Sequence, residues 1–183
     1  AASCADAGTE AFVKLHDTKI EGVKRIELAA WLDNRGAFVE ALPFSANYPV
    51  RQINLSKNEN AGTVRGMHWQ VAPAAQVKIV YAVAGRFMDV AVDIRRDSPT
   101  YGAVVTLELQ PFSNALYIPA GVAHGCQALD DGATLMYLLD VGYDPKCERG
   151  FRVDDPAIRG IWPMPLVNVA RRDMNWPWMK ELP

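Results

Sequence analysis

Residues 76–94 read QVKIVYAVAGRFMDVAVDI, and this stretch decides the fold class. Two runs rich in β-branched and aromatic residues flank Ala84-Gly85, a composition typical of two strands joined by a short turn. We therefore expect a β-hairpin here. Similar runs, each bounded by Pro, Gly, Asn or Asp, follow at 103–110 (AVVTLELQ), 115–121 (ALYIPAG) and 133–143 (ATLMYLLDVGY).

Evenly spaced short strands predict an all-β protein, and we expect a jelly-roll β-sandwich or barrel with a few short helices. Long segments with an apolar period of 3.6 residues are scarce, which argues against a doubly wound α/β fold. The clearest candidate for helical structure is a short turn within residues 23–32.

No internal repeat, low-complexity tract or linker divides the sequence, so we expect one domain over residues 19–183. The first residues of the chain (AASCA) are small and show no hydrophobic periodicity. We therefore expect residues 1–18 to form a flexible lead. Residues 156–165 are punctuated by prolines and are expected to form a loop.

The charge balance limits the classes of partner that the protein can bind. Nineteen basic and 21 acidic residues give a sequence pI near 5.9, which provides no overall field for holding nucleic acid or an anionic membrane. The apolar stretches are broken well before the roughly 20 residues that a membrane span needs. Three irregularly spaced cysteines favour neither a disulfide scaffold nor a zinc site, so we expect a reduced, cytoplasmic protein.

Two of the three histidines lie in polar, glycine-flanked contexts: His68 in RGMHWQ and His124 in IPAGVAHG. The third, His16, falls in the expected lead and is given no role. A single histidine is more often structural than catalytic, but here cationic residues accompany the pair. The candidates for binding a diphosphate are Arg35, Arg65, Lys78 and Arg172, some of which lie beside glycine, where the backbone can approach a ligand closely. The Arg95-Arg96 pair is interpreted as solvated surface charge.

The sequence lacks the motifs of several other enzyme classes. A metal-dependent cupin usually offers two histidines one residue apart with a carboxylate and a further histidine, and His68-Trp69-Gln70 supplies only one ligand. There is no GxSxG elbow, no GxGxxG and no Walker sequence. We therefore expect no metal and no cofactor.

Several sequence blocks, taken in order, resemble the dTDP-4-dehydrorhamnose 3,5-epimerase family over about residues 19–177. The resemblance implies a dimeric, cupin-like jelly roll that needs no cofactor and acts on a nucleoside-diphosphate 4-keto-6-deoxyhexose. The blocks are NRGAFVE (34–40), QIN (52–54), GTVRGMHWQ (62–70), QVK (76–78), DVAVDIR (89–95), IPAGVAHG (118–125), YDP (143–145), ERG (148–150) and DDP (154–156).

The resemblance also implies residue roles. His68 is similar to the family's general base, Asp173 to the carboxylate that orients it, Tyr137 to the general acid on the opposite face of the sugar, and Lys78 to the lysine beside the keto oxygen. Tyr143 resembles the aromatic residue that packs on the nucleobase of the substrate. Arg35 and Glu40 would serve the neighbouring subunit's site. The positions that match substrate contacts are Arg35, Glu40, Gln52, Asn54, Arg65, His124, Glu148 and Arg172.

These roles form a coherent chemistry. A ketone at C4 acidifies the hydrogens on C3 and C5, because the carbanion is delocalised as an enolate. A histidine near its working pH can remove such a hydrogen, a lysine can hold the oxyanion, and a tyrosine can return a proton to the other face. A related ketoisomerase would use similar proton transfers. A non-catalytic jelly roll that binds nucleotide sugars would retain the arginines but lack the acid-base geometry.

The sequence departs from the family at three places. Arg171-Arg172-Asp173 replaces Ser-x-Lys-Asp, Val153 replaces the Trp before Asp-Asp-Pro, and Gln127 occupies a usually apolar position. We expect Arg172 and Gln127 to lie close to the ligand. The sequence does not decide whether the nucleotide is dTDP, CDP or GDP, which sugar is bound, or whether C3, C5 or both are inverted.

Overall fold

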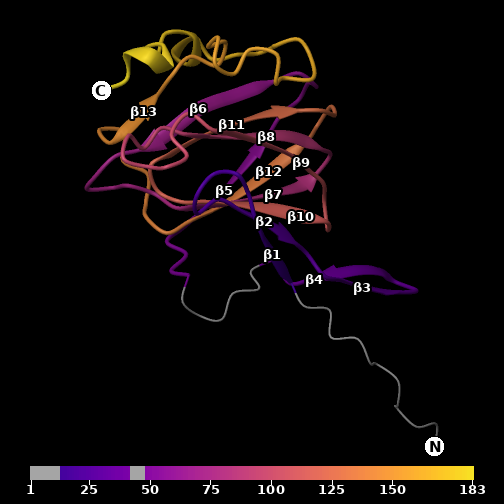
Figure 1. The fold of residues 1–183 in the computed structure, drawn as a ribbon. Coiled ribbons are helices and arrows are strands. Elements are labelled where there is room, and N and C mark those ends of the chain that lie inside the picture. The colour runs from indigo at the N-terminus through magenta and orange to yellow at the C-terminus, as the bar shows by residue number, and fades with distance from the viewer. Residues whose placement is uncertain (1–12, 42–47) are drawn as a thin grey trace, which may run out of the picture.

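The computed structural model describes residues 13–41 and 48–183, which form two antiparallel sheets stacked face to face (Figure 1). One sheet holds six strands in the order β1 (Lys14–Asp17), β2 (Lys24–Glu27), β10 (Asn114–Ile118), β7 (Lys78–Ala84), β12 (Thr134–Leu139) and β5 (Gln52–Lys57). The other holds five, in the order β13 (Glu148–Gly150), β6 (Val64–Gln70), β11 (Val122–Ala128), β8 (Phe87–Asp93) and β9 (Val104–Leu109).

This architecture confirms the expected all-β jelly roll. The helices of the described residues are two short 3-10 turns, η1 (Arg171–Met174) and η2 (Met179–Glu181), and no helix there is long and apolar enough to cross a membrane. The helical turn expected within residues 23–32 was wrong. Those residues include β2, which is held as a strand because it pairs with β1 on one side and β10 on the other.

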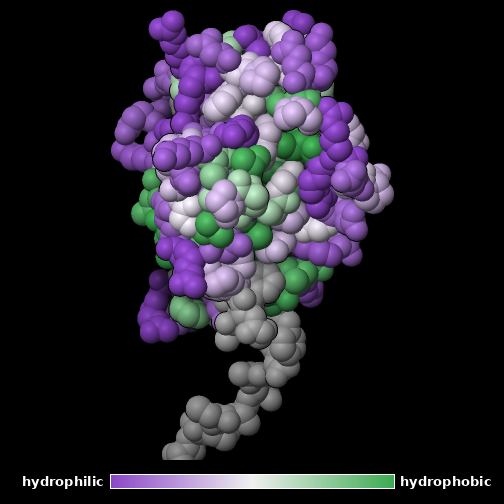
Figure 2. Space-filling view, turned by 90° about the vertical axis from the view of Figure 1, so that its left-hand side faces the viewer, coloured by the Kyte–Doolittle hydropathy of each residue, from purple (hydrophilic) through white to green (hydrophobic). Residues whose placement is uncertain are grey.

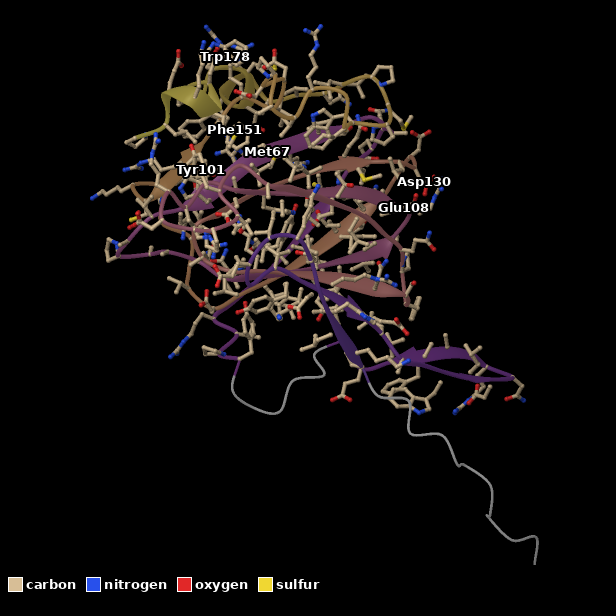
Figure 3. All side chains as sticks on the ribbon, in the orientation of Figure 1. Met67, Tyr101, Glu108, Asp130, Phe151 and Trp178 are labelled. Carbon is tan, nitrogen blue, oxygen red and sulfur yellow. The ribbon has the colours of Figure 1, made fainter. Side chains whose placement is uncertain are left out.

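The hairpin expected at residues 76–94 was also wrong, although both of its strands exist. β7 pairs with β10 and β12, whereas β8 pairs with β9 and β11, so the turn between them carries the chain from one sheet to the other. Arg86 fixes this turn by donating from its backbone N–H and its guanidinium to Asp130, at the end of the sandwich where Figure 3 labels Asp130. Each strand is interior to its sheet and therefore needs two partners of its own.

Among the described residues, the core consists of three clusters of buried hydrophobic residues, one of which gathers Ile26, Ile79 and Tyr81 of the six-stranded sheet. Side chains from both sheets, such as Val80, Leu135 and Phe87, fill the space between them. A second cluster lies on the outer face of the five-stranded sheet, where Met67 and Phe151 pack beneath the C-terminal segment (Figure 3). Because both faces of this sheet are covered, every residue of β11 is buried.

The N-terminal part of the chain differs from the expectation. β1 pairs with β2, so the flexible lead expected for residues 1–18 does not extend over residues 14–17, and residues 1–12 lie outside the described part. Residues 156–165 contain no strand or helix and form the expected loop.

A separate hairpin of β3 (Ala30–Asp33) and β4 (Gly36–Val39) projects away from the sandwich (Figure 1). We call this hairpin the arm. It exposes apolar side chains, including Leu32 at 77% and Phe38 at 69% of their surface. The space-filling view of Figure 2 also shows hydrophobic residues gathered near the middle of one face of the protein, between hydrophilic ones.

Candidate active site

A cavity of about 670 Å³ is lined by strands of both sheets and by the segment that leads into η1. Most of the residues expected at a site line it together, although they are scattered over more than a hundred positions of sequence. They are Asn54, Arg65, His68, Lys78, His124, Tyr137, Tyr143, Glu148, Arg172 and Asp173.

His68 and Asp173 form a hydrogen-bonded pair in this cavity. His68 Nε2 lies 2.7 Å from Asp173 Oδ1, and the backbone N–H of Gly66 donates to Asp173 Oδ2 over 3.4 Å. Burial opposes ionisation of Asp173, but its hydrogen bond to His68, helped by the charge of Arg172, holds the pKa of this carboxyl below its ordinary value. An ionised carboxylate accepts the Nε2 proton and leaves Nδ1 as the nitrogen that can take one up.

Two glycines fix the register that presents His68. Gly66 has φ +126°, and a Cβ there would lie 2.5 Å from Gly125 Cα on the paired strand β11. This close approach sets His68 directly opposite His124 in the ladder between β6 and β11. The glycine flanks noted around both histidines in the sequence therefore reflect backbone contact between the two strands.

His124 belongs to a second pair, which the sequence interpretation missed. Its Nε2 lies 2.8 Å from Oδ1 of Asp89, a fully buried residue of β8. Asp89 Oδ2 is also buried, and it has no hydrogen-bond partner among the described residues. In the sequence, Asp89 stands alone within an apolar run, and only the pairing of β8 with β11 brings it to the histidine.

Tyr137 enters the cavity from β12, in the opposite sheet to His68. Its hydroxyl lies 3.8 Å from Cys126 Sγ, and its ring packs edge-on to His124. Burial, together with the nearby Cys126 thiol and the Asp89 carboxylate, raises the pKa of Tyr137 well above its ordinary value. The phenol therefore keeps its proton at neutral pH and can donate it.

Lys78, on β7 of the same sheet as Tyr137, donates from Nζ to the backbone carbonyl of His68 over 3.4 Å. Burial lowers the pKa of Lys78 to about 8, against the opposing effect of Glu148 and Asp89. At neutral pH most of this group is still a cation. It can therefore stabilise a negative oxygen that develops beside it.

Polar residues around one end of the cavity hold one another in place. Glu148 Oε2 accepts hydrogen bonds from Tyr143 Oη at 2.8 Å and from Arg172 Nη1 at 3.0 Å. Gln52 does not line the cavity, but its side chain donates to Asn54 Oδ1 and accepts from the backbone N–H of Tyr143. This network holds the Tyr143 ring and the Asn54 amide in the cavity wall.

The family model of dTDP-4-dehydrorhamnose 3,5-epimerase matches residues 17–181 of the chain. The chain belongs to this family. It is 38% identical to the dTDP-4-dehydrorhamnose 3,5-epimerase of Sinorhizobium fredii, covering 90% of this chain and 88% of that one. It is 36% identical to the same enzyme of Mycobacterium tuberculosis, covering 83% and 79%.

Solved structures agree with this assignment. A 4-keto-6-deoxy sugar epimerase from the novobiocin gene cluster of Streptomyces spheroides matches with a TM-score of 0.86 and 32% identity, covering 98% of this chain and 93% of that one. The Legionella pneumophila 3,5-epimerase, solved with dTDP-4-keto-L-rhamnose, matches with a TM-score of 0.85 and 31% identity, over 93% and 95%. The protein is thus an epimerase of nucleotide sugars.

Besides Gln52, two of the expected site residues of this epimerase do not line the cavity. Arg35 is exposed on the arm, where its guanidinium pairs with Asp33 at 2.6 Å, and Glu40 is exposed just beyond β4. Within one chain they do not meet His68 or Tyr137.

Gln127 of the epimerase does not lie at the cavity, contrary to expectation. It is fully buried on β11, where its Nε2 donates to Met164 O at 2.9 Å and its Oε1 accepts from Met164 N at 3.1 Å. It fastens the proline-rich loop to the sheet. Val153 is fully buried, and its carbonyl accepts a hydrogen bond from the indole of Trp162. Of the three departures from the family pattern, only that at Arg172 reaches the cavity.

Over residues 13–41 and 48–183, no group of three or more His, Cys, Asp or Glu side chains is arranged to hold a metal ion.

Proposed function

We propose that the enzyme inverts C3, C5 or both in a dTDP-linked 4-keto-6-deoxyhexose, with His68 as base and Tyr137 as acid. One observation carries the proposal: the His68–Asp173 pair and the protonated Tyr137 line the same cavity from different sheets. Inversion needs a proton removed from one face of the ring and returned to the other. Two walls that each carry one of these groups meet that need.

Each step balances in protons and electrons. His68 Nδ1 takes the hydrogen beside the C4 ketone as a proton, and the C–H electron pair becomes the C=C bond of an enolate whose charge rests on O4. The Lys78 ammonium stabilises that oxygen. Tyr137 then forms the new C–H bond from the opposite face, and the proton held by His68 returns through solvent to the tyrosinate.

The nucleotide part of the substrate would be held by the remaining cavity residues. Arg65 and Arg172 are suited to the diphosphate, and Tyr143 offers a ring for the base. Asn54, Glu148 and His124 supply further hydrogen-bonding groups, and Gln52 holds Asn54 and Tyr143 in place from outside the cavity. A dTDP nucleotide is favoured because related structures contain it, among them a Streptomyces bikiniensis 3'-monoepimerase in complex with dTDP-quinovose.

We also propose a homodimer in which the arm of each subunit completes the site of its partner. Seven of the eight strand residues of the arm are exposed, and so are Arg35 and Glu40 on or beside it. The six-stranded sheet ends on the edge strand β5, which exposes Ile53 and Leu55. An unpaired edge with exposed apolar residues is suited to pairing with a second copy. The buried free thiols of Cys126 and Cys147 suit the reducing cytoplasm.

The proposal is tested by proton exchange in heavy water. The enzyme is incubated with dTDP-, CDP- and GDP-linked 4-keto-6-deoxyglucose, and NMR identifies the carbons that gain deuterium and the product formed. Exchange at C3 or C5 with inversion of the dTDP sugar is expected, and a moved carbonyl would instead identify a ketoisomerase. A folded His68→Ala protein that exchanges at the wild-type rate would overturn the assignment of the base.

A further inference from the structure

Arg65 is the guanidinium of the cavity whose charge is left uncompensated. Arg172 is paired with Glu148 at 3.0 Å and lies 3.4 Å from Asp173. Arg65, by contrast, makes one hydrogen bond within the described part of the chain, from Nε to Asn58 Oδ1 at 2.8 Å. Its two terminal nitrogens therefore keep their donors free for an anion.

Asn58 itself is held rigidly. It is 2% exposed, its Nδ2 donates to Ser56 O at 3.2 Å and to Ala133 O at 3.4 Å, and its backbone N–H donates to Ala133 O at 2.8 Å. The two carbonyls decide which end of the amide carries nitrogen, so Oδ1 must face Arg65. The partner of Arg65 is thus a fixed acceptor and not a mobile surface group.

The neutrality of Asn58 matters as much as its position. A carboxylate at the same distance would orient the guanidinium but cancel its charge, and so compete with an anionic ligand. An amide oxygen orients the guanidinium while leaving its full charge. Glu59 also lines the cavity, but it pairs with Lys57 at 3.1 Å.

We infer that Asn58 is a positioning residue for the diphosphate of the substrate, acting through Arg65. It fixes one edge of the guanidinium so that the opposite edge is preorganised for phosphate oxygens, which reduces the entropy lost on binding. This inference rests on the proposed role of Arg65 and adds a residue of the cavity wall that acts by holding Arg65.

The test measures binding of dTDP by calorimetry and turnover of the dTDP-linked 4-keto sugar. Asn58→Ala should weaken dTDP binding about tenfold and raise KM by a similar factor, while kcat stays within about twofold. Arg65→Ala should weaken binding more. In the Arg65→Ala background, Asn58→Ala should have no further effect, because the residue through which it acts is gone.

The matched control is Asn114→Ala. Asn114 is also buried, its side-chain amide also bonds backbone groups, at Gln110 and Glu108, and it lies outside the cavity. Its loss should lower stability but leave dTDP binding unchanged. Unchanged binding by Asn58→Ala, or an equal loss with and without Arg65, would overturn the inference. Failure of the wild-type protein to bind dTDP would instead overturn the proposed function.

A second measurement does not need a folded Asn58 variant. In the wild-type protein, the Arg65 Nε–H resonance, assigned by its disappearance in Arg65→Lys, should be protected from exchange with water before any ligand is added. An Arg65 Nε–H that exchanges as fast as that of an unbonded surface arginine would show that Asn58 does not hold it.

Discussion

Tyr137 and His68 belong to different sheets, so their functions should be separable by mutation. Tyr137→Phe keeps the ring and its packing but removes the proton that the residue can give. His68 should still remove a hydrogen, and the enolate should be reprotonated from the side it left. NMR in heavy water should show deuterium incorporation with retained configuration, while inverted product falls on the order of a hundredfold. Equal losses of exchange and inversion would make Tyr137 a positioning residue.

The pH dependence should report Lys78. Its pKa of about 8 lies below the ordinary value because burial disfavours the cation. The cation is present below pH 8 and is lost above it, so kcat/KM should fall about tenfold per pH unit in the alkaline range. Lys78→Arg, which keeps its charge, should move this decline upward. A flat wild-type profile from pH 7 to pH 9.5 would contradict the role.

The same burial makes Lys78 costly for folding. A group whose pKa is lower in the folded state than in the unfolded state destabilises the fold at every pH at which the unfolded chain is protonated, and pH 7 is in that range. Lys78→Met should therefore raise Tm at pH 7 while abolishing turnover. A thermal melt beside the activity assay distinguishes this outcome from unfolding, since a structural lysine would lower both when replaced.

At the scale of elements, Gln127 connects β11 to the loop before η1. Gln127→Leu removes both hydrogen bonds that the buried Gln127 amide makes with the backbone N–H and C=O of Met164, which should lower the free energy of unfolding by about 1–3 kcal/mol. Because this loop leads to Arg172 and Asp173, KM should rise as well. Gln110→Leu, an exposed position in the same sandwich, is the control and should change neither quantity. A denaturant melt of Gln127→Leu that superimposes on that of the wild type would show that these hydrogen bonds do not stabilise the fold.

Strand positions were largely predictable because β-branched runs between turn residues are a local signal, as at β7, β8 and β12. Their pairing was not. β7 and β8 adjoin in sequence but lie in different sheets, since partners are chosen by contacts between segments distant in the chain. Asp89 and Asn58 were missed for the same reason. Asp89 lies in the block at residues 89–95 but was given no role, and Asn58 lies outside every block; each acquires its partner only through the fold.

At the scale of the whole molecule, a dimer with exchanged arms predicts complementation. His68→Ala and Arg35→Ala homodimers should each be impaired, because every site carries one defect. In a mixed dimer, one site collects both defects and the other has none, so mixing the two proteins under exchange conditions should restore activity. Sedimentation should show a dimer throughout. Activity that stays at the average of the two parents would place Arg35 outside the partner's site.

The attachment of His68 and Tyr137 to opposite sheets has a consequence for evolution and engineering. The gap between these two side chains depends on the spacing of the sheets, which the hydrophobic layer between them sets. Substitutions of core residues such as Leu135 or Phe87, which never touch a sugar, can therefore widen or narrow the gap. Relatives that invert one carbon or two could in this way diverge through the volume of their aliphatic side chains while keeping every reactive group.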